Sequence, residues 1–121
     1  MRKNRQLAQR HGHHAEFIAL WFLRLKGYRL LAHRFKSPGG EIDLIMRRGE
    51  TTAFIEVKAR TTVDQAIMSV TPQQSKRIAN AAAFYTSRHH GVAKSYCRFD
   101  IVAVPSYLWP CHIENAFDGK P

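Results

Sequence analysis

The chain has 121 residues, 45% of them hydrophobic, and a formal net charge of +10. These values exclude a disordered chain and predict one globular domain, which buries roughly two thirds of the surface that the unfolded chain exposes. No apolar stretch approaches the length of a membrane-spanning helix, about 20 residues. The only cysteines, Cys97 and Cys111, form no CxxC pair and no disulfide framework. We therefore expect a cytoplasmic protein with no membrane partner.

The positive charge is concentrated in the first part of the chain. Residues 1–48 contain 11 Lys and Arg against 3 Asp and Glu, whereas residues 49–121 contain 8 against 6. A basic surface of this kind predicts binding to a polyanion, and to nucleic acid in particular. The alternative is that the charge only keeps the protein soluble.

The first predicted element is a helix over residues 12–26. Residues 1–11 are polar and basic and predict a flexible arm, and residues 12–121 predict a single domain. The helix is apolar on almost every side, which is typical of a buried helix, and Gly27 ends it. Its aromatic side chains are therefore expected in the core: Phe17, Trp21 and Phe22.

The remaining predicted elements give the order α-β-β-β-α-β. A strand over residues 28–35 precedes a β-hairpin over residues 41–59, and residues 61–70 predict a loop. Thr71 as a cap and Pro72 at the first helical position start a helix over residues 73–88. A strand follows over residues 96–104, and a short strand over residues 111–117 is expected to be the last. This order predicts an α/β fold with a mixed sheet flanked by helices.

The hairpin carries acidic residues in the middle of otherwise apolar strands. If Gly49 and Glu50 form a two-residue turn, counting back along both strands places Asp43 opposite Glu56 and Glu41 opposite Lys58. Two carboxylates that face each other across a ladder repel, and this destabilises a sheet. A divalent cation between them removes the repulsion, and Mg²⁺ in particular takes oxygen ligands. The pattern therefore outlines a metal-dependent site for phosphodiester hydrolysis, with a lysine where a phosphate would lie.

Six short motifs along the chain resemble those of a known family. In their order and spacing the chain is similar to the YraN-like family of small bacterial proteins, which resemble PD-(D/E)XK (restriction-endonuclease-like) nucleases and archaeal Holliday-junction resolvases. Ile42 stands where that superfamily has the proline of its PD motif. The motifs are Gly12-x-x-Ala15-Glu16, Gly40-Glu41-Ile42-Asp43-Leu44-Ile45, Phe54-Ile55-Glu56-Val57-Lys58-x-Arg60, Lys76, Arg98-Phe99-Asp100 and Asn115-Ala116-Phe117.

The resemblance implies a restriction-endonuclease-like αβββαβ core and a set of catalytic residues. Asp43, Glu56 and the backbone carbonyl of Val57 would bind Mg²⁺ or Mn²⁺. Lys58 would orient or deprotonate the attacking water and offset the charge that grows in the transition state. The alternative is structural: Asp43 and Glu56 pair with Lys58 or Arg60, and Lys58 pairs with the opposite glutamate.

Glu16 is the acid of the first helix, among apolar residues at helical spacing. A buried carboxylate needs a partner, and the metal site or Lys58 would supply one, which agrees with the helix-one glutamate of the resolvase-like relatives. The alternative is an acid that caps the start of its helix.

A second group of residues is expected beside the catalytic ones. Glu41 would extend the metal shell or hold Lys58, and the basic first turns of the second helix would grip a phosphate backbone. A solvated basic face is the alternative. The predicted nucleic-acid-binding residues are Glu41, Arg60, Gln74, Lys76 and Arg77.

The function expected from these features is that of a divalent-metal-dependent endonuclease acting on DNA, branched or single-stranded rather than plain duplex. No small-molecule cofactor is expected. Two alternatives stay open: a nucleic-acid-binding module with little catalysis, and an accessory subunit of a DNA-processing complex. Because related folds often pair two active sites, a homodimer is one expected assembly.

Overall fold

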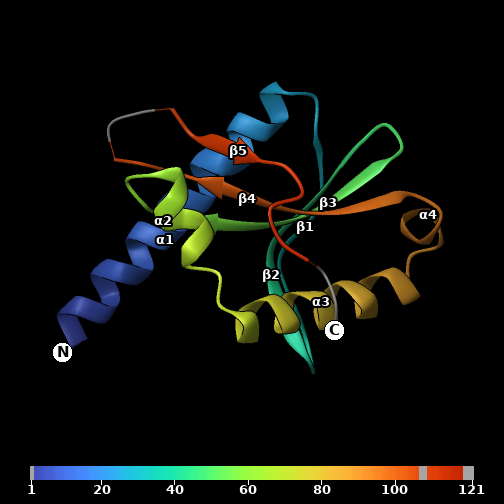
Figure 1. Ribbon diagram of the computed structural model, residues 1–121, viewed down its shortest axis with the longest axis horizontal. Helices are drawn as coiled ribbons and strands as arrows, with labels where there is room; N and C mark the ends of the chain where they lie inside the picture. Colours follow the sequence, from blue (N-terminus) through green and yellow to red (C-terminus); the bar gives the residue numbers. More distant parts are fainter. Residues whose placement is uncertain (1, 107–108, 119–121) are drawn as a thin grey trace.

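The computed structural model describes the backbone of residues 2–106 and 109–118 and the side chains of residues 14–106 and 109–118. A five-stranded sheet lies at its centre, with helices α1 and α3 on opposite faces (Figure 1). The strand order is β1-β2-β3-β4-β5, in which only β3 and β4 are parallel neighbours. The predicted mixed sheet flanked by helices is confirmed. The elements are α1 (Arg2–Leu25), β1 (Arg29–Ser37), β2 (Gly40–Arg48), β3 (Thr51–Lys58), α2 (Val63–Met68), α3 (Pro72–Ser87), α4 (His90–Ala93), β4 (Tyr96–Ala103) and β5 (Cys111–Ile113).

Helix α1 packs on the sheet through a row of small and apolar side chains. Ala15, Ala19 and Leu23 are spaced four residues apart, so they share one face of the helix, and all three are buried. The methyl side chains of the two alanines let the helix axis come close to β2 and β3. The helix ends as predicted, because Gly27 adopts a φ of 93° that disfavours any other residue.

The aromatic residues of α1 do not all lie in the core. Phe22 is half-buried against the core, but Phe17 is 60% exposed and Trp21 is 48% exposed. The prediction that both belong to the core is wrong, because the sheet covers only one face of this helix. Phe17 and Trp21 contact each other edge to face, and the Arg24 guanidinium lies over the Trp21 ring.

Helix α1 also begins earlier than the sequence predicted. Its backbone is helical from Arg2, where the sequence predicted a flexible basic arm over residues 1–11. The side chains of residues 1–13 lie outside the described part of the chain. The division of the chain into an arm and a domain stays a prediction.

The register of the β2–β3 hairpin is the predicted one. Arg48 pairs with Thr51, which makes Gly49 and Glu50 the two-residue turn, and Gly49 has the positive φ that such a turn requires. The pairing continues to Leu44 opposite Ile55. The ladder ends at this pair, and one further step in the same count would set Asp43 opposite Glu56.

Segment 61–70 contains a short helix, so the prediction of a loop there is wrong. Thr62 caps α2 by accepting a hydrogen bond from the Gln65 backbone N–H at 3.1 Å. Ala66 is buried against Ile101 and Ala103. A helix of six residues is too short for a hydrophobic period to show in the sequence.

The last strand is shorter than predicted. Strand β5 covers Cys111–Ile113 rather than residues 111–117, and Asn115 follows with a φ of 52°, which strand backbone does not adopt. Both cysteines are free and exposed. Within the described residues, no helix is long and apolar enough to cross a membrane.

Candidate active site

The predicted carboxylate pair comes together where β2 begins and β3 ends. The Asp43 carboxylate accepts a hydrogen bond from the Val57 backbone N–H at 2.8 Å. The Glu56 side chain is hydrogen-bonded to Asp43, and Glu56 is only 8% exposed. A hydrogen bond between two carboxyl groups requires a proton on one of them, so this contact favours the protonated form of Glu56.

Glu56 is the member of the pair whose pKa is raised. Burial raises the pKa of Glu56 to about 10, and the hydrogen bond and negative charge of Asp43 act in the same direction. The positive charge of Lys58 opposes the rise but does not cancel it. The raised pKa favours the protonated form of Glu56, and a cation between the two carboxyl groups would relieve the same repulsion.

A change in strand direction explains how Asp43 reaches this position. Ile42 packs in the α3-side core and Leu44 in the α1-side core, although residues two apart in a regular strand share a face. Strand β2 must therefore twist at Asp43. In the neighbouring strand β1, His33 pairs with Leu44 and Phe35 pairs with Ile42. Arg34 lies between these two pairs, at the level of Asp43, and has a φ of 50°. The positive φ of Arg34 and the change of face in β2 both lie at the start of the site, whereas the bulge of the β1–β2 pairing lies between Leu30 and Ala32.

Gln74 connects Glu56 to Lys58 across the sheet–helix boundary. Its side-chain amide donates to Glu56 Oε2 at 3.3 Å, and its side-chain carbonyl accepts from Lys58 Nζ at 3.1 Å. Gln74 lies in the first turn of α3, where Thr71 caps the helix at 3.1 Å. Lys58 is thus held in the site by a neutral partner, rather than by the salt bridge to Glu41 that the hairpin register permitted.

Close contact between α3 and β2 completes the wall of the site. A Cβ at Gly40 would lie 1.9 Å from the Arg77 carbonyl oxygen, so only glycine fits there. Next to it, the Arg77 guanidinium pairs with Glu41 at 2.7 Å, and this pairing lowers the pKa of Glu41. Glu41 therefore has an arginine partner from α3.

Glu16 also has an arginine partner. Its carboxylate accepts from Arg34 Nε at 2.9 Å, and His33 Nε2 lies 3.7 Å from the same oxygen. It lies in the middle of α1, not at a helix start, so it does not cap the helix. The partner that its partial burial requires comes from β1 rather than from Lys58.

Within the described chain, the remaining predicted residues, Lys76 and Arg60, are exposed and form no hydrogen bond or ion pair with Asp43, Glu56 or Lys58. Lys76 is exposed on α3, and Arg60 is exposed just after β3, where it contacts the carbonyl of its neighbour Ala59. Among the described residues, no group of three or more His, Cys, Asp or Glu side chains could hold a metal ion together. The structure brings together two side chains that could be metal ligands, the carboxyl groups of Asp43 and Glu56. Their all-oxygen chemistry fits a hard divalent cation.

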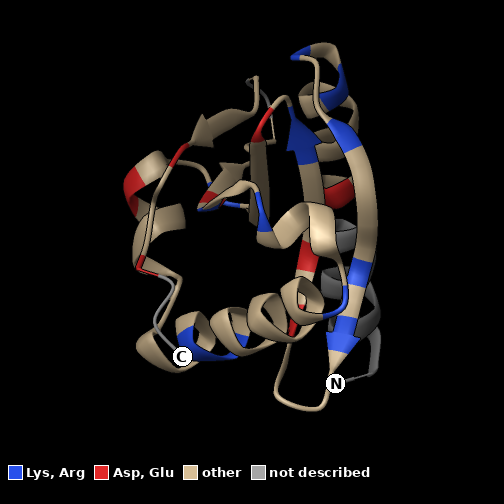
Figure 2. Ribbon diagram, turned by 90° about the vertical axis from the view of Figure 1, so that its right-hand side faces the viewer, with Lys and Arg blue, Asp and Glu red and all other residues tan. Residues whose placement is uncertain are grey.

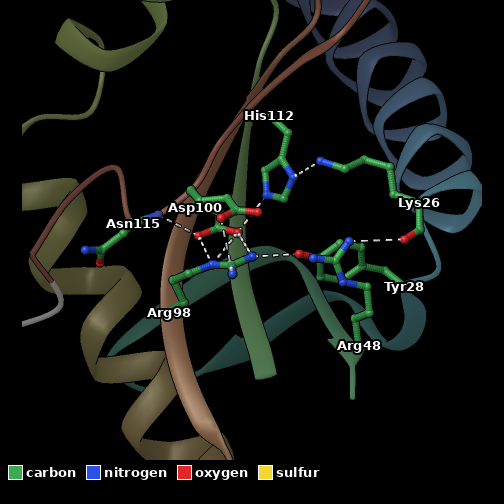
Figure 3. A network of polar contacts seen from close by, with 8 residues as sticks. Lys26, Tyr28, Arg48, Arg98, Asp100, His112 and Asn115 are labelled. Atoms are coloured by element: carbon green, nitrogen blue, oxygen red, sulfur yellow. Dashed lines mark hydrogen bonds and ion pairs between the residues drawn. The ribbon is translucent and has the colours of Figure 1, made fainter. Parts of the chain in front are cut away.

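A second buried acid, Asp100, lies on β4 and has a full set of partners (Figure 3). Arg98 donates to both of its oxygens at 2.8 to 3.1 Å, and the Asn115 backbone N–H donates at 2.9 Å. His112 Nε2 lies 2.7 Å from Asp100, and Lys26 Nζ lies 2.7 Å from His112 Nδ1. Because an ammonium group can only donate, Nδ1 accepts and Nε2 carries the proton toward Asp100.

This network joins β4, β5 and the end of α1, which supports the prediction that Asp100 is structural. Burial tends to raise the pKa of Asp100, but the hydrogen bonds from His112, Arg98 and the Asn115 backbone outweigh it and lower the pKa. The sequence did not point to His112. The only sequence signal was Asp100 itself, an acid in the middle of an apolar strand. Such an acid requires partners from elsewhere in the fold, but the sequence does not say which residues they are.

Comparison with known proteins places the chain in a family. The model of the uncharacterised protein family UPF0102 matches residues 15–104, which contain the whole candidate site. The chain belongs to this family. The family was expected from the YraN-like motifs, and this part of the resemblance is confirmed.

Similar UPF0102 proteins are found in several bacteria. One from Chelativorans sp. is 50% identical over 119 residues, covering 98% of this chain and 96% of its own length. The UPF0102 protein mlr4633 of Mesorhizobium japonicum is 45% identical, covering 97% of this chain and 94% of its own. The UPF0102 protein amb4503 of Paramagnetospirillum magneticum is 48% identical, covering 93% and 90%. These UPF0102 proteins thus match this chain over most of their length.

Proposed function

We propose that this UPF0102 protein is a divalent-metal-dependent endonuclease that hydrolyses phosphodiester bonds in branched or single-stranded DNA. The observation that carries the proposal is the buried Asp43–Glu56 pair with Lys58 beside it, because two facing carboxyl groups are destabilising unless a proton or cation lies between them. The mixed sheet and the order of the motifs suit a restriction-endonuclease-like core. A homodimer with two such sites is part of the same proposal.

The residues would divide the chemistry between them. Asp43, Glu56 and the Val57 carbonyl would hold Mg²⁺ or Mn²⁺, and the ion would supply Lewis-acid activation of the phosphate and of a water molecule. Gln74 holds the Lys58 ammonium beside Glu56, where it would orient the attacking water and offset negative charge on the phosphate. Glu41, Arg60, Lys76 and Arg77 would lie along the DNA backbone.

One assay tests the proposal directly. Purified protein is incubated with single-stranded, duplex, flap and four-way-junction DNA in Mg²⁺, Mn²⁺ or EDTA, and products are resolved on denaturing gels. We expect cleavage of at least one of these DNAs in the presence of metal and none in EDTA. Cleavage that is equally fast with Asp43→Asn would contradict the site.

A second candidate is a DNA-binding module with little catalysis. It is favoured by the ion pairs of Glu16 and Glu41 with arginines, since both acids are then engaged away from a metal. In that case binding would be strongly salt-dependent, with the slope of log affinity against log salt steepened by about 0.9 per neutralised phosphate, but no cleavage would occur in any metal. A slope near zero would instead indicate a protein partner.

A further inference from the structure

A hollow lined by basic side chains lies at the other end of α3 from the candidate active site. It has a volume of about 420 Å³, and we call it the basic hollow. Strands β1 and β2, the end of α3 and the start of α4 form its walls. Figure 2 shows Lys and Arg recurring along β1 and at the end of β2. The lining residues are Arg29, Leu31, Arg47, Tyr85, Arg88, His89, His90, Gly91 and Val92.

The charges of the basic hollow are not balanced by acids. Arg29 and Arg47 are direct cross-strand partners, an arrangement of like charges that destabilises a strand pair. Arg88 adds a third guanidinium, which lies over the Phe84 ring and donates from Nη1 to Ser87 Oγ. No described lining residue is an Asp or Glu. Elsewhere in the described chain, Arg34, Arg77 and Arg98 each pair with a carboxylate. The repulsion within the hollow would be relieved by an anion.

Hydrogen bonds within the hollow fix the orientation of Arg47 and His89 and leave N–H groups of Arg47 available to a ligand. Arg47 donates from Nε to the Gly49 carbonyl and from Nη1 to the Gly91 carbonyl, both at 2.9 Å. These two bonds fix the guanidinium plane, and within the described chain its other N–H donors have no partner. His89 donates from Nδ1 to the Tyr85 carbonyl at 2.8 Å and stacks on the Tyr85 ring, which sets its orientation. Fixed arginine forks match the geometry of a phosphate group.

We propose that the basic hollow binds a phosphate group. This inference rests in part on the proposed function, because a DNA backbone is the phosphate source that suits a nuclease. Arg88 follows Gln74 by 14 positions along α3, so the two ends of the helix are about 21 Å apart at 1.5 Å per residue. A DNA strand that advances 3.4 Å per base pair spans this distance in about six base pairs. The hollow would thus hold the backbone away from the point of cleavage.

The test measures binding in EDTA, so it does not depend on catalysis. The double variant Arg29→Gln/Arg88→Gln removes two exposed charges of the hollow, and Arg24→Gln/Lys94→Gln removes two exposed charges outside it. Affinity for a labelled 30-base-pair duplex is measured by fluorescence anisotropy at several salt concentrations. A second series measures the rise in melting temperature that inorganic phosphate produces. Circular dichroism checks that each variant is folded, and Arg29→Gln alone replaces any double variant that is not.

We expect the hollow variant to bind the duplex roughly tenfold more weakly and with a salt slope shallower by about 0.9, while the control changes much less. If the duplex is bound equally but phosphate stabilises the wild type and not the hollow variant, the phosphate group comes from a smaller compound. Equal behaviour of wild type and hollow variant in both series would overturn the proposal. So would an equal loss in the control. A protein that cleaves no DNA but loses binding in the hollow variant would refute the nuclease and leave the hollow standing.

Discussion

Two acids buried in the same sheet, Asp100 and Glu56, have opposite surroundings. Asp100 receives hydrogen bonds from Arg98, His112 and the Asn115 backbone, and its pKa is lowered. Glu56 faces Asp43, a second carboxyl group, and its pKa is raised to about 10 by burial and by that neighbour. A buried acid with a full set of donors holds strands together, whereas a buried acid that faces another acid meets a repulsion that a proton or a cation would relieve.

The largest expected effect is on catalysis at the candidate site. Asp43→Asn or Glu56→Gln should lower metal-dependent cleavage by roughly 10³-fold, since each removes a proposed metal ligand. DNA affinity in EDTA should stay the same or rise, because neither change adds negative charge and Asp43→Asn removes a carboxylate that would face a polyanion. Initial cleavage rates and anisotropy measured on the same preparations separate the two effects. Unchanged rates would assign Asp43 and Glu56 to structure alone.

At the other acid the expected effect is on stability. Asp100→Asn leaves the largely buried Arg98 without its counter-charge, and we expect a loss of about 3–5 kcal/mol in the free energy of unfolding. Urea unfolding followed by circular dichroism at pH 7 measures it. The same experiment on Glu56→Gln serves as the comparison and should show a smaller loss or a gain.

The contribution of Asp100 should also depend on pH. Its pKa is lower in the folded protein than its ordinary value of 3.8, so the unfolded chain takes up a proton first as the pH falls. The stabilisation is therefore fully present above about pH 4 and is lost as the pH falls toward the lowered value. Wild type should lose its advantage over Asp100→Asn as the pH falls from about 4 toward the lowered pKa. A constant difference across that range would contradict the assignment.

An intermediate effect is expected where α3 meets β2. Gly40→Ala places a methyl group on the Arg77 carbonyl, and we expect a loss of about 1–3 kcal/mol or more in stability. It should also lower cleavage, because the start of α3 carries Gln74. Gly91→Ala is the control, since a Cβ there meets its nearest neighbour only at 4.0 Å. Melting temperatures of the two variants give the comparison, and equal temperatures would remove the argument for close contact.

The smallest expected effect is at Glu16. Glu16→Gln keeps the shape of the side chain but removes its charge from a pair with the partly exposed Arg34, so stability should fall by about 1 kcal/mol or less. If Glu16 also belongs to the active site, the metal concentration for half-maximal cleavage should rise. A change in stability with no change in metal dependence would make it only a partner of Arg34.

The hairpin was predictable because its information is local. Gly49 and Glu50 set the turn, the turn sets the register as far as Leu44 and Ile55, and Asp43 and Glu56 interact just beyond that pair. The partner of Glu16 was not predictable, because it depends on an irregular φ at Arg34 in a different strand. Gln74 was expected at the DNA rather than in the site. It lies three residues after Thr71, as in a capping box, and the sequence does not show that its side chain turns to Glu56 instead.

The exposed aromatic residues of the chain determine which spectroscopic signals report on it. The chain has two tryptophans, and Trp21 is 48% and Trp109 is 79% exposed in the folded state. Their emission should therefore change little when the protein unfolds, which makes tryptophan fluorescence a poor measure of its stability. The same exposure makes Trp21, with the Arg24 guanidinium above its ring, a built-in reporter of any molecule that settles on the outer face of α1.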